Sequence, residues 1–251
     1  MAAVPVQENK YYEGLEAFIE NNETETWRMV MNFSKYIDRQ HLSLFLARYE
    51  IFKKIVNIHG AIVECGVWNG NGLMSWAQFC AIMEPYNYVR RIIGFDTFKG
   101  FPSVDGKDLV KDKSSDRRTE FKLEVGQLKT NSYDELVRAV ELFDQNRPIG
   151  HVKKIELVNG DAAKTIPGYV KNNPHLMVSL LNLDFDLYEP TKAAIECLVP
   201  RMPKGGVIIF DEANDERWPG ETMALADTLG ISSLKIERFP FEPKISYAVI
   251  Q

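Results

Sequence analysis

The chain has 251 residues, of which 45% are hydrophobic, and this supply of apolar side chains excludes wholesale disorder. A formal net charge of −5 argues against a nucleic-acid partner held by bulk electrostatics, but it leaves a nucleotide-sized ligand open. The three cysteines have no CxxC spacing, and the sequence shows neither a signal-peptide pattern nor a long apolar run, so we expect a reduced, cytoplasmic protein without a membrane partner.

Residues 1–58 are predicted to form an N-terminal helical extension. Asn22, with Glu25 three residues later, resembles a capping box at the start of a helix. Further on, apolar residues recur at three- and four-residue spacing and define one helix face: Leu42, Phe45, Tyr49, Phe52 and Val56. This face either packs on the main domain or forms a dimer interface. We expect a homo-oligomer of at least two copies.

From residue 59 to residue 251, short apolar runs alternate with amphipathic stretches. The predicted strands cover residues 61–68, 90–98, 153–161, 177–188, 205–213, 233–239 and 245–250. The helices predicted between them cover residues 72–85, 132–147, 162–172, 189–199 and 220–230. This alternation predicts an α/β fold, in which a mostly parallel seven-stranded sheet carries helices on both faces. Because no helix separates the last two strands, we expect them to form an antiparallel hairpin at the edge.

Each of the first five predicted strands ends in an acidic residue or a pair of them. They are Glu64, Asp96, Asp161, the pair Asp184 and Asp186, and the pair Asp211 and Glu212. Open α/β sheets bind their ligands at the carboxyl ends of the strands. One or two such acids are compatible with helix caps, whereas five in succession predict a ligand site.

The turn after the first strand reads ECGVWNGNG, and its glycines let a ligand approach the backbone closely. Its glycine spacing does not match the dinucleotide fingerprint. An acid shortly before the first glycine fits S-adenosylmethionine better, since that ligand carries an ammonium group and no pyrophosphate. A tight turn without a ligand is the alternative. Asp96 is placed to accept ribose hydroxyls, or to cap a helix, and Asp161 either borders an adenine or caps the next helix.

The stretch LLNLDFDLYEPT, residues 180–191, places two aspartates within an apolar run. In an extended strand Asp184, Asp186 and Tyr188 share one face, and Asp211 and Glu212 end the neighbouring strand. Carboxylates that converge in this way repel one another, so either some are protonated or a cation joins them. Oxygen ligands without a nearby His or Cys favour Mg²⁺. The alternative is a set of solvated caps that never converge.

Residues 99–130 are dense in charge and show little periodicity. A segment of this length after the second strand is either a lid that closes over the site or a solvated insertion.

Four motifs, in this order and spacing, resemble the macrocin O-methyltransferase family: IVECGVWNGNGLMSWA, IIGFDTFKGFPSVDGKD, LNLDFDLYEPT and GGVIIFDEAND. Members of this family are S-adenosylmethionine- and Mg²⁺-dependent enzymes that methylate sugar hydroxyls, often on antibiotic glycosides or nucleotide-linked sugars. The resemblance covers roughly residues 40–215. It implies a Rossmann-like methyltransferase fold with an antiparallel last strand, and a small-molecule glycoside or nucleotide-sugar acceptor.

The resemblance also implies roles for single residues. Asp186 would be the general base, and Asp184, Asp211 and Glu212 would hold the metal, with Glu212 standing where relatives often have Asp. Metal coordination would lower the pKa of the acceptor hydroxyl, and Asp186 would take its proton. The residues expected to contact the cofactor are Glu64, Gly66, Val67, Trp68, Asp96, Thr97, Ser103, Asp161, Ala162 and Asp184.

Other functions compete with this interpretation. The D-x-D spacing of Asp184 and Asp186 also occurs in metal-dependent glycosyltransferases. Within the methyltransferases, a phenolic or catechol acceptor is an alternative to a sugar. A non-catalytic scaffold with the same fold would be favoured by loss of the acids, and none of them is lost.

Overall fold

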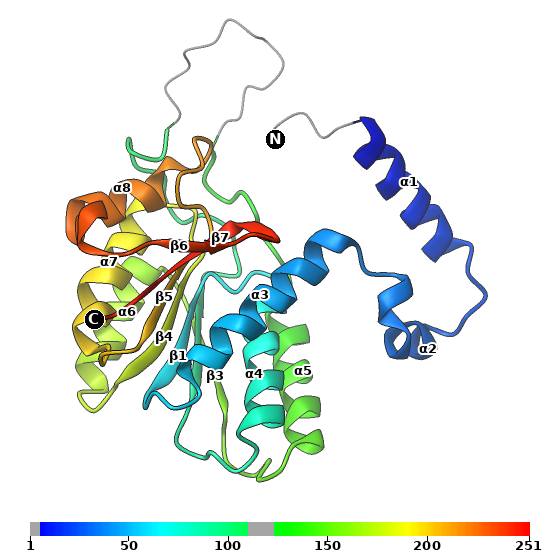
Figure 1. Cartoon of the computed structure of the whole chain (residues 1–251), viewed down its shortest axis with the longest axis horizontal. Helices are drawn as coiled ribbons and strands as arrows, with labels where there is room; N and C mark the ends of the chain where they lie inside the picture. Colours follow the sequence, from blue (N-terminus) through cyan, green and yellow to red (C-terminus); the bar gives the residue numbers. More distant parts are fainter. Residues whose placement is uncertain (1–5, 110–122) are drawn as a thin grey trace, which may run out of the picture.

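The computed structural model describes residues 6–109 and 123–251 and is built around one seven-stranded sheet (Figure 1). The strand order is β3-β2-β1-β4-β5-β7-β6. Strands β1 to β5 pair in parallel, β7 runs antiparallel to β5, and β6 pairs antiparallel with β7. The strands are β1 (Ala61–Cys65), β2 (Ile92–Asp96), β3 (Ile155–Asn159), β4 (Val178–Leu183), β5 (Val207–Phe210), β6 (Glu237–Phe239) and β7 (Glu242–Val249). The predicted mostly parallel sheet with its antiparallel last strand is confirmed.

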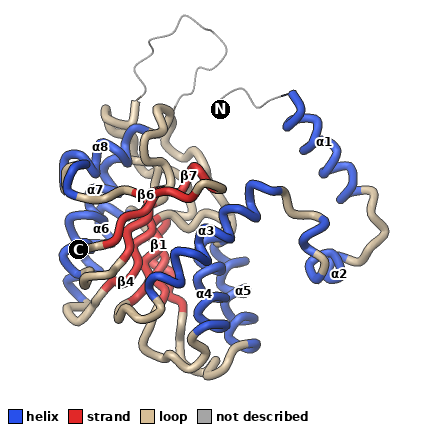
Figure 2. The backbone as a smooth tube through the Cα atoms, viewed as in Figure 1, coloured by secondary structure: helices blue, strands red, loops and turns tan. Residues whose placement is uncertain are grey.

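The central strands are apolar on both faces because helices cover both sides of the sheet (Figures 1 and 2). One layer contains α3 (Arg39–Ile55), α4 (Asn71–Met83) and α5 (Tyr133–Asn146). The opposite layer contains α6 (Ala162–Asn172), α7 (Tyr188–Leu198) and α8 (Pro219–Thr228). Short 3₁₀ turns lie at η1 (Phe33–Lys35), η2 (Val199–Arg201) and η3 (Ile231–Ser233). The carboxyl ends of the parallel strands therefore form a single edge between two helical layers.

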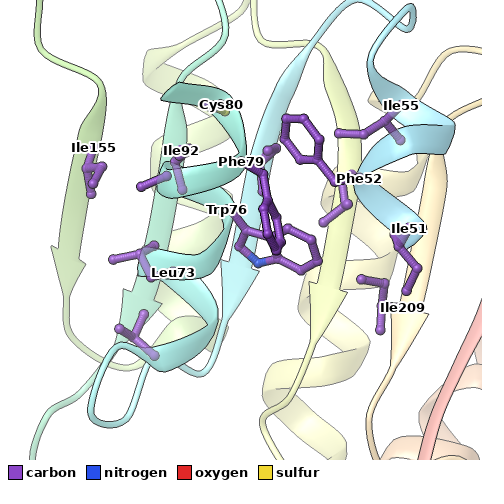
Figure 3. Packing of buried hydrophobic residues seen from close by; sticks show 14 of the residues in the cluster. Ile51, Phe52, Ile55, Leu73, Trp76, Phe79, Cys80, Ile92, Ile155 and Ile209 are labelled. Carbon is purple, nitrogen blue, oxygen red and sulfur yellow. The ribbon is translucent and has the colours of Figure 1, made fainter. Parts of the chain in front are cut away.

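Helix α3 is part of the core, because its apolar face packs on α4 and on the sheet (Figure 3). The ring centroid of Phe79 lies 4.9 Å from that of Phe45, 5.6 Å from that of Tyr49 and 5.7 Å from that of Phe52. The helix face predicted from the spacing thus packs on the main domain, and it is not left free as a dimer interface. The domain boundary expected at residue 58 stays a prediction.

Two further helices, α1 (Val6–Glu20) and α2 (Thr26–Met31), stand away from the sheet and its covering layers (Figures 1 and 2). The predicted capping box is wrong. Asn22 Oδ1 accepts a hydrogen bond from the nearby backbone N–H of Thr24 at 2.8 Å, and the N-cap of α2 is Glu25. Apolar side chains are exposed along this N-terminal segment: Tyr11, Tyr12, Phe18, Ile19, Trp27, Val30, Met31 and Phe33.

All three cysteines are free, as expected, and Cys65 and Cys80 are buried. None of the described helices is long and apolar enough to cross a membrane.

Candidate active site

The turn after β1 is held by Asp96, the last residue of β2. Its Oδ2 accepts hydrogen bonds from the backbone N–H groups of Val67 and Trp68, each at 2.8 Å, and its Oδ1 accepts one from Phe98 at 2.6 Å. A carboxylate offers about four acceptor positions, so roughly one is left for a ligand. The acceptor count therefore allows one ribose hydroxyl beside the three backbone hydrogen bonds.

Gly66 brings this turn against the end of β4. Its φ is +92°, and a Cβ at this position would lie 1.9 Å from the carbonyl oxygen of Asp184. The next two backbone N–H groups, of Val67 and Trp68, both donate to Asp96, and Trp68 is 56% exposed. The cofactor contacts expected of Gly66, Val67 and Trp68 stay predictions.

Glu64 is enclosed by protein groups and is 1% exposed. Its Oε2 accepts hydrogen bonds from Trp76 Nε1 at 2.6 Å and from Asn182 Nδ2 at 3.1 Å. A Cβ at Gly72 would lie only 1.9 Å from the Oε1 of Glu64. Burial raises the pKa of Glu64 to about 7, opposed by the positive charge of Arg48. Glu64 therefore joins β1, β4 and α4 beneath the turn, and its direct contact with a cofactor stays a prediction.

The other expected cofactor residues lie at the same edge on the β2 and β3 side. Asp161 is the N-cap of α6, where its Oδ1 accepts from the Ala163 N–H at 3.1 Å and its Oδ2 pairs with Lys164 at 2.7 Å. The capping alternative is thus realised, and an adenine contact would be additional. Thr97 Oγ1 donates to the Gly100 carbonyl at 2.6 Å, Ser103 is exposed and Ala162 is buried.

Asp184 and Asp186, in the stretch LLNLDFDLYEPT, lie in a turn, which corrects the expected strand. Strand β4 ends at Leu183, although the N–H of Asp184 still donates to the Cys65 carbonyl at 2.8 Å. Asp186 has a φ of +62°, and α7 begins at Tyr188. These three residues therefore do not share a strand face as predicted. The chain must reverse within four residues to enter α7, and this reversal ends the extended backbone.

The acids after β4 and β5 nevertheless interact strongly with one another. Burial raises the pKa of Asp184 well above its usual range, and the charges of Asp211 and Asp186 raise it further. Burial acts in the same way on the pKa of Asp186, together with the charges of Glu212 and Asp211. Burial and the charge of Asp211 raise the pKa of Glu212 to about 7. The charges of these carboxyl groups therefore act on one another, and the predicted metal site stays a prediction.

The chemistry of the acids after β4 and β5 favours a metal ion, whereas their arrangement in the structure does not form a metal site. Four oxygen-bearing side chains that disfavour one another's ionisation suit a hard divalent cation. Within residues 6–109 and 123–251, however, no group of three or more His, Cys, Asp or Glu side chains is placed so that it could hold a metal ion. The oxygen chemistry of the donor set fits Mg²⁺, whereas its arrangement in the structure is not that of a formed metal site.

Sequence reasoning missed two buried charged residues beside these acids. Arg48 on α3 is 6% exposed, and its charge opposes the burial that raises the pKa of Asp184, Asp211 and Glu64. In the described part of the chain its Nη1 has no hydrogen-bond partner. Its position three residues after Phe45, within the apolar face, was a usable signal.

The second is Glu221 on α8, which is fully buried. Its Oε1 accepts a hydrogen bond from the Glu212 N–H at 3.1 Å, and burial raises its pKa well above the usual range. Only the tertiary fold brings it to the acids, because its sequence neighbours carry no sign of this contact.

Fold and site together define a Rossmann-like methyltransferase, with a glycine turn after β1 and acids at the ends of the following strands. The chain belongs to the macrocin-O-methyltransferase family, whose profile matches residues 41–224. The solved structure of NovP, an O-methyltransferase, shares the fold at 18% identity, with a TM-score of 0.59 over 85% of this chain and 80% of NovP.

Two structures of CalS11 and one curated relative are more similar to this chain in sequence than NovP is. The crystal structure of CalS11, a calicheamicin methyltransferase, superposes with a TM-score of 0.89 at 30% identity and covers 97% of this chain and 93% of that one. An apo structure of CalS11, described as a TDP-rhamnose 3'-O-methyltransferase, gives 0.81 at 29% identity over 97% and 94%.

A curated relative from Streptomyces olivaceus is 29% identical over 160 residues, or 62% of this chain. It is an 8-demethyl-8-(2,3-dimethoxy-alpha-L-rhamnosyl)-tetracenomycin-C 4'-O-methyltransferase, and the match spans about half of its length, 53%.

Proposed function

We propose that the chain is an S-adenosylmethionine-dependent O-methyltransferase that acts on a sugar hydroxyl of a glycoside or nucleotide-linked sugar in natural-product biosynthesis. The family match over residues 41–224 carries this proposal, since it includes the glycine turn and every acid-bearing strand end. Both CalS11 and the Streptomyces olivaceus relative are named for rhamnose-containing acceptors. A rhamnosyl group is therefore the first acceptor to test.

The proposed cofactor, S-adenosylmethionine, would lie along the turn at residues 66–68, with its ribose near Asp96. The backbone of this turn supports the proposal, because two hydrogen bonds to Asp96, from the N–H groups of Val67 and Trp68, already hold it. A site whose backbone is preset loses little conformational entropy on binding.

We propose that Asp184, Asp211 and Glu212 hold Mg²⁺, supported by the mutual repulsion of the acids at this edge. The ion, when bound, would lower the pKa of an acceptor hydroxyl and fix its orientation. A carboxylate oxygen of Asp186 would accept the proton of the acceptor hydroxyl. At the same time the hydroxyl oxygen of the acceptor would attack the methyl group of the sulfonium. Burial and the charges of Glu212 and Asp211 raise the pKa of Asp186, which makes its carboxylate a stronger base than that of an ordinary aspartate.

A labelled-methyl transfer assay tests the activity. The purified chain is incubated with S-adenosylmethionine and TDP-rhamnose, with catechol in place of the sugar as a parallel acceptor. Label is expected in the sugar nucleotide and to depend on Mg²⁺, being lost with chelator and restored by added ion. Transfer to catechol alone would replace the sugar by a phenolic acceptor. Full activity in excess chelator would remove the metal from the chemistry, and a TDP-rhamnose-dependent glycosyl transfer without methylation would favour the glycosyltransferase alternative.

We also propose a homo-oligomer of at least two copies. The support is the set of apolar side chains that α1 and α2 expose, among them Trp27 at 56% and Met31 at 72%. Burying such residues against a second copy removes apolar surface from water. Sedimentation equilibrium is expected to give at least twice the chain mass of 28.7 kDa, and a monomer at all concentrations would exclude the proposal.

A further inference from the structure

The segment that follows Thr97 reaches across the carboxyl edge of the sheet to α7. Its anchor is Asp108, which is 1% exposed. The Oδ1 of Asp108 accepts a hydrogen bond from the backbone N–H of Tyr188 at 2.6 Å, across 80 residues of chain, and its Oδ2 accepts one from Asp105 at 2.8 Å. Both oxygens of a buried carboxylate are thus committed to backbone donors.

Tyr188 is the first residue of α7, and its N–H belongs to the group of donors that a helix leaves without an intrahelical partner. The N-cap residue, Leu187, has no side-chain oxygen to accept it. Asp108 therefore caps α7 from another part of the chain. Its negative charge also lies at the end of the helix where the backbone dipole favours an anion.

The capped helix end lies directly after the turn that carries Asp184 and Asp186. This turn has four residues between the end of β4 and the start of α7. One end is fixed by the bond from the Asp184 N–H to the Cys65 carbonyl, and the other by the bond from Tyr188 to Asp108. Between these two points Asp186 holds a left-handed backbone with φ of +62°, which a non-glycine residue adopts only when its surroundings impose it.

Helix α8 packs closely against the Asp108 carboxylate at Gly220. A Cβ at Gly220 on α8 would lie 2.2 Å from its Oδ1 and 2.6 Å from the Tyr188 nitrogen. Beside it, Lys107 Nζ lies 3.9 Å from the centroid of the Tyr188 ring, donates to the Tyr188 hydroxyl at 2.7 Å and pairs with Asp227 on α8. The segment is therefore held to α7 and α8 by a buried cap and a more exposed ion pair.

We propose that Asp108 is a positioning residue for methyl transfer, which holds the Asp184–Leu187 turn, and with it the Asp186 carboxylate, in its working geometry by capping α7. The proposal rests on the proposed function in assigning Asp186 as the base. Asp108 itself would not touch the acceptor.

Hydrogen–deuterium exchange on the full chain without ligands tests the cap itself. In Asp108→Ala, exchange in peptides covering residues 184–190 is expected to accelerate roughly tenfold, as fits loss of a buried helix cap. Gly220→Ala, whose new Cβ displaces the carboxylate, should act in the same direction. Asp108→Asn keeps one acceptor oxygen and should stay within about threefold of wild type.

The matched control is Asp38→Ala, which removes another buried cap, since Asp38 is 6% exposed and accepts from the His41 N–H at 2.7 Å at the start of α3. This control should leave exchange in peptides 184–190 unchanged. Unchanged exchange in Asp108→Ala, or equal acceleration throughout the chain, would overturn the cap.

Kinetics with S-adenosylmethionine and TDP-rhamnose test the positioning. Asp108→Ala should lower kcat by roughly 10- to 100-fold, the cost of a misplaced reacting group, with the calorimetric Kd for S-adenosylmethionine within about twofold. An unaltered kcat despite faster exchange would refute positioning. A wild-type chain inactive on TDP-rhamnose would count against the proposed acceptor, and the exchange result would still decide the cap.

Discussion

Asp186 combines a left-handed backbone with a carboxyl group whose pKa is raised by burial and by the charges of neighbouring acids, Glu212 and Asp211 first among them. If it accepts the proton, Asp186→Asn keeps the shape of the side chain and removes its basicity. We expect the single-turnover rate of methyl transfer at saturating Mg²⁺ to fall about 10²- to 10⁴-fold, the usual contribution of general base catalysis. Binding of S-adenosylmethionine should be unchanged.

The control for Asp186→Asn is Asp134→Asn, the same substitution at an exposed position in the first turn of α5. Its turnover should equal that of wild type. Near-normal turnover in Asp186→Asn would assign the proton to another acceptor.

The carboxyl group of Glu64 makes stability depend on pH. Its pKa rises from 4.5 to about 7 on folding, because burial outweighs the charge of Arg48 and the hydrogen bonds from Trp76 and Asn182. The folded chain then retains a proton that the unfolded chain has already released, so the contribution is full below the unfolded pKa and is lost as the pH rises through about 7. The shift corresponds to roughly 3 kcal/mol.

We therefore expect the free energy of unfolding of the chain, freed of metal and cofactor, to fall between about pH 5 and pH 8. In Glu64→Gln the fall over the same pH range should be smaller by about 3 kcal/mol. Urea denaturation at the two pH values measures both quantities. The other buried acids, such as Asp184, should leave a residual slope of the same sign. An identical slope in the two proteins would mean that Glu64 ionises normally.

At the scale of the element, substitutions on α3 can test whether this helix and the sheet share one hydrophobic core. Phe52 is fully buried against Phe79, whereas Tyr49, on the same helix, is 36% exposed. Phe52→Ala should lower the free energy of unfolding by about 3–5 kcal/mol because it leaves a cavity. Tyr49→Ala should cost about 1 kcal/mol. Equal costs, measured by urea denaturation, would show that α3 contributes little to the core.

The elements also show what the sequence could determine. Apolar runs located all seven strands, and they are clearest in β1, β2, β4 and β5, where burial on both faces requires apolar residues such as Val63 and Leu181. The same pattern extended β4 to residue 188, because apolar residues continue through Phe185 and Leu187. Local spacing does not report the reversal at Asp186, which tertiary contacts impose. The cap expected at Asn22 failed for a related reason, as its side chain bonds the nearer Thr24 N–H.

For the molecule as a whole, the order of acids along the chain was enough to place them at one edge, because parallel strands end on the same side. Arg48, Asp108 and Glu221 were not found, since each reaches the edge from an element distant in sequence. The contacts of Asp108 and Glu221 form only after folding and leave no local pattern, whereas the position of Arg48 within an apolar helix face was a signal that the sequence did offer. The lid expected over residues 99–130 stays a prediction, and residues 110–122 lie outside the part of the chain that the structure describes.

The N-terminal helices provide a test at this scale. No residue of α2 is buried, and its apolar side chains face outward. Deleting residues 1–37 should therefore change the Tm of the remaining chain by no more than about 4 °C, the shift that roughly 1 kcal/mol produces in a domain of this size. If α1 and α2 join two copies, the deletion should also reduce the sedimentation mass to that of one chain. An oligomer that survives the deletion would place the contact elsewhere.

Strand β7 lies between β5 and β6 although it follows both in the chain. During synthesis, β5 must therefore wait with one edge unpaired until residues 242–249 have left the ribosome, while β1 to β4 are already able to pair. An unpaired edge of apolar residues such as Ile208 and Phe210 is a template for association with other chains. Nascent or prematurely terminated chains that stop before Glu242 should accordingly aggregate through β5. This tendency should end once β7 pairs with β5.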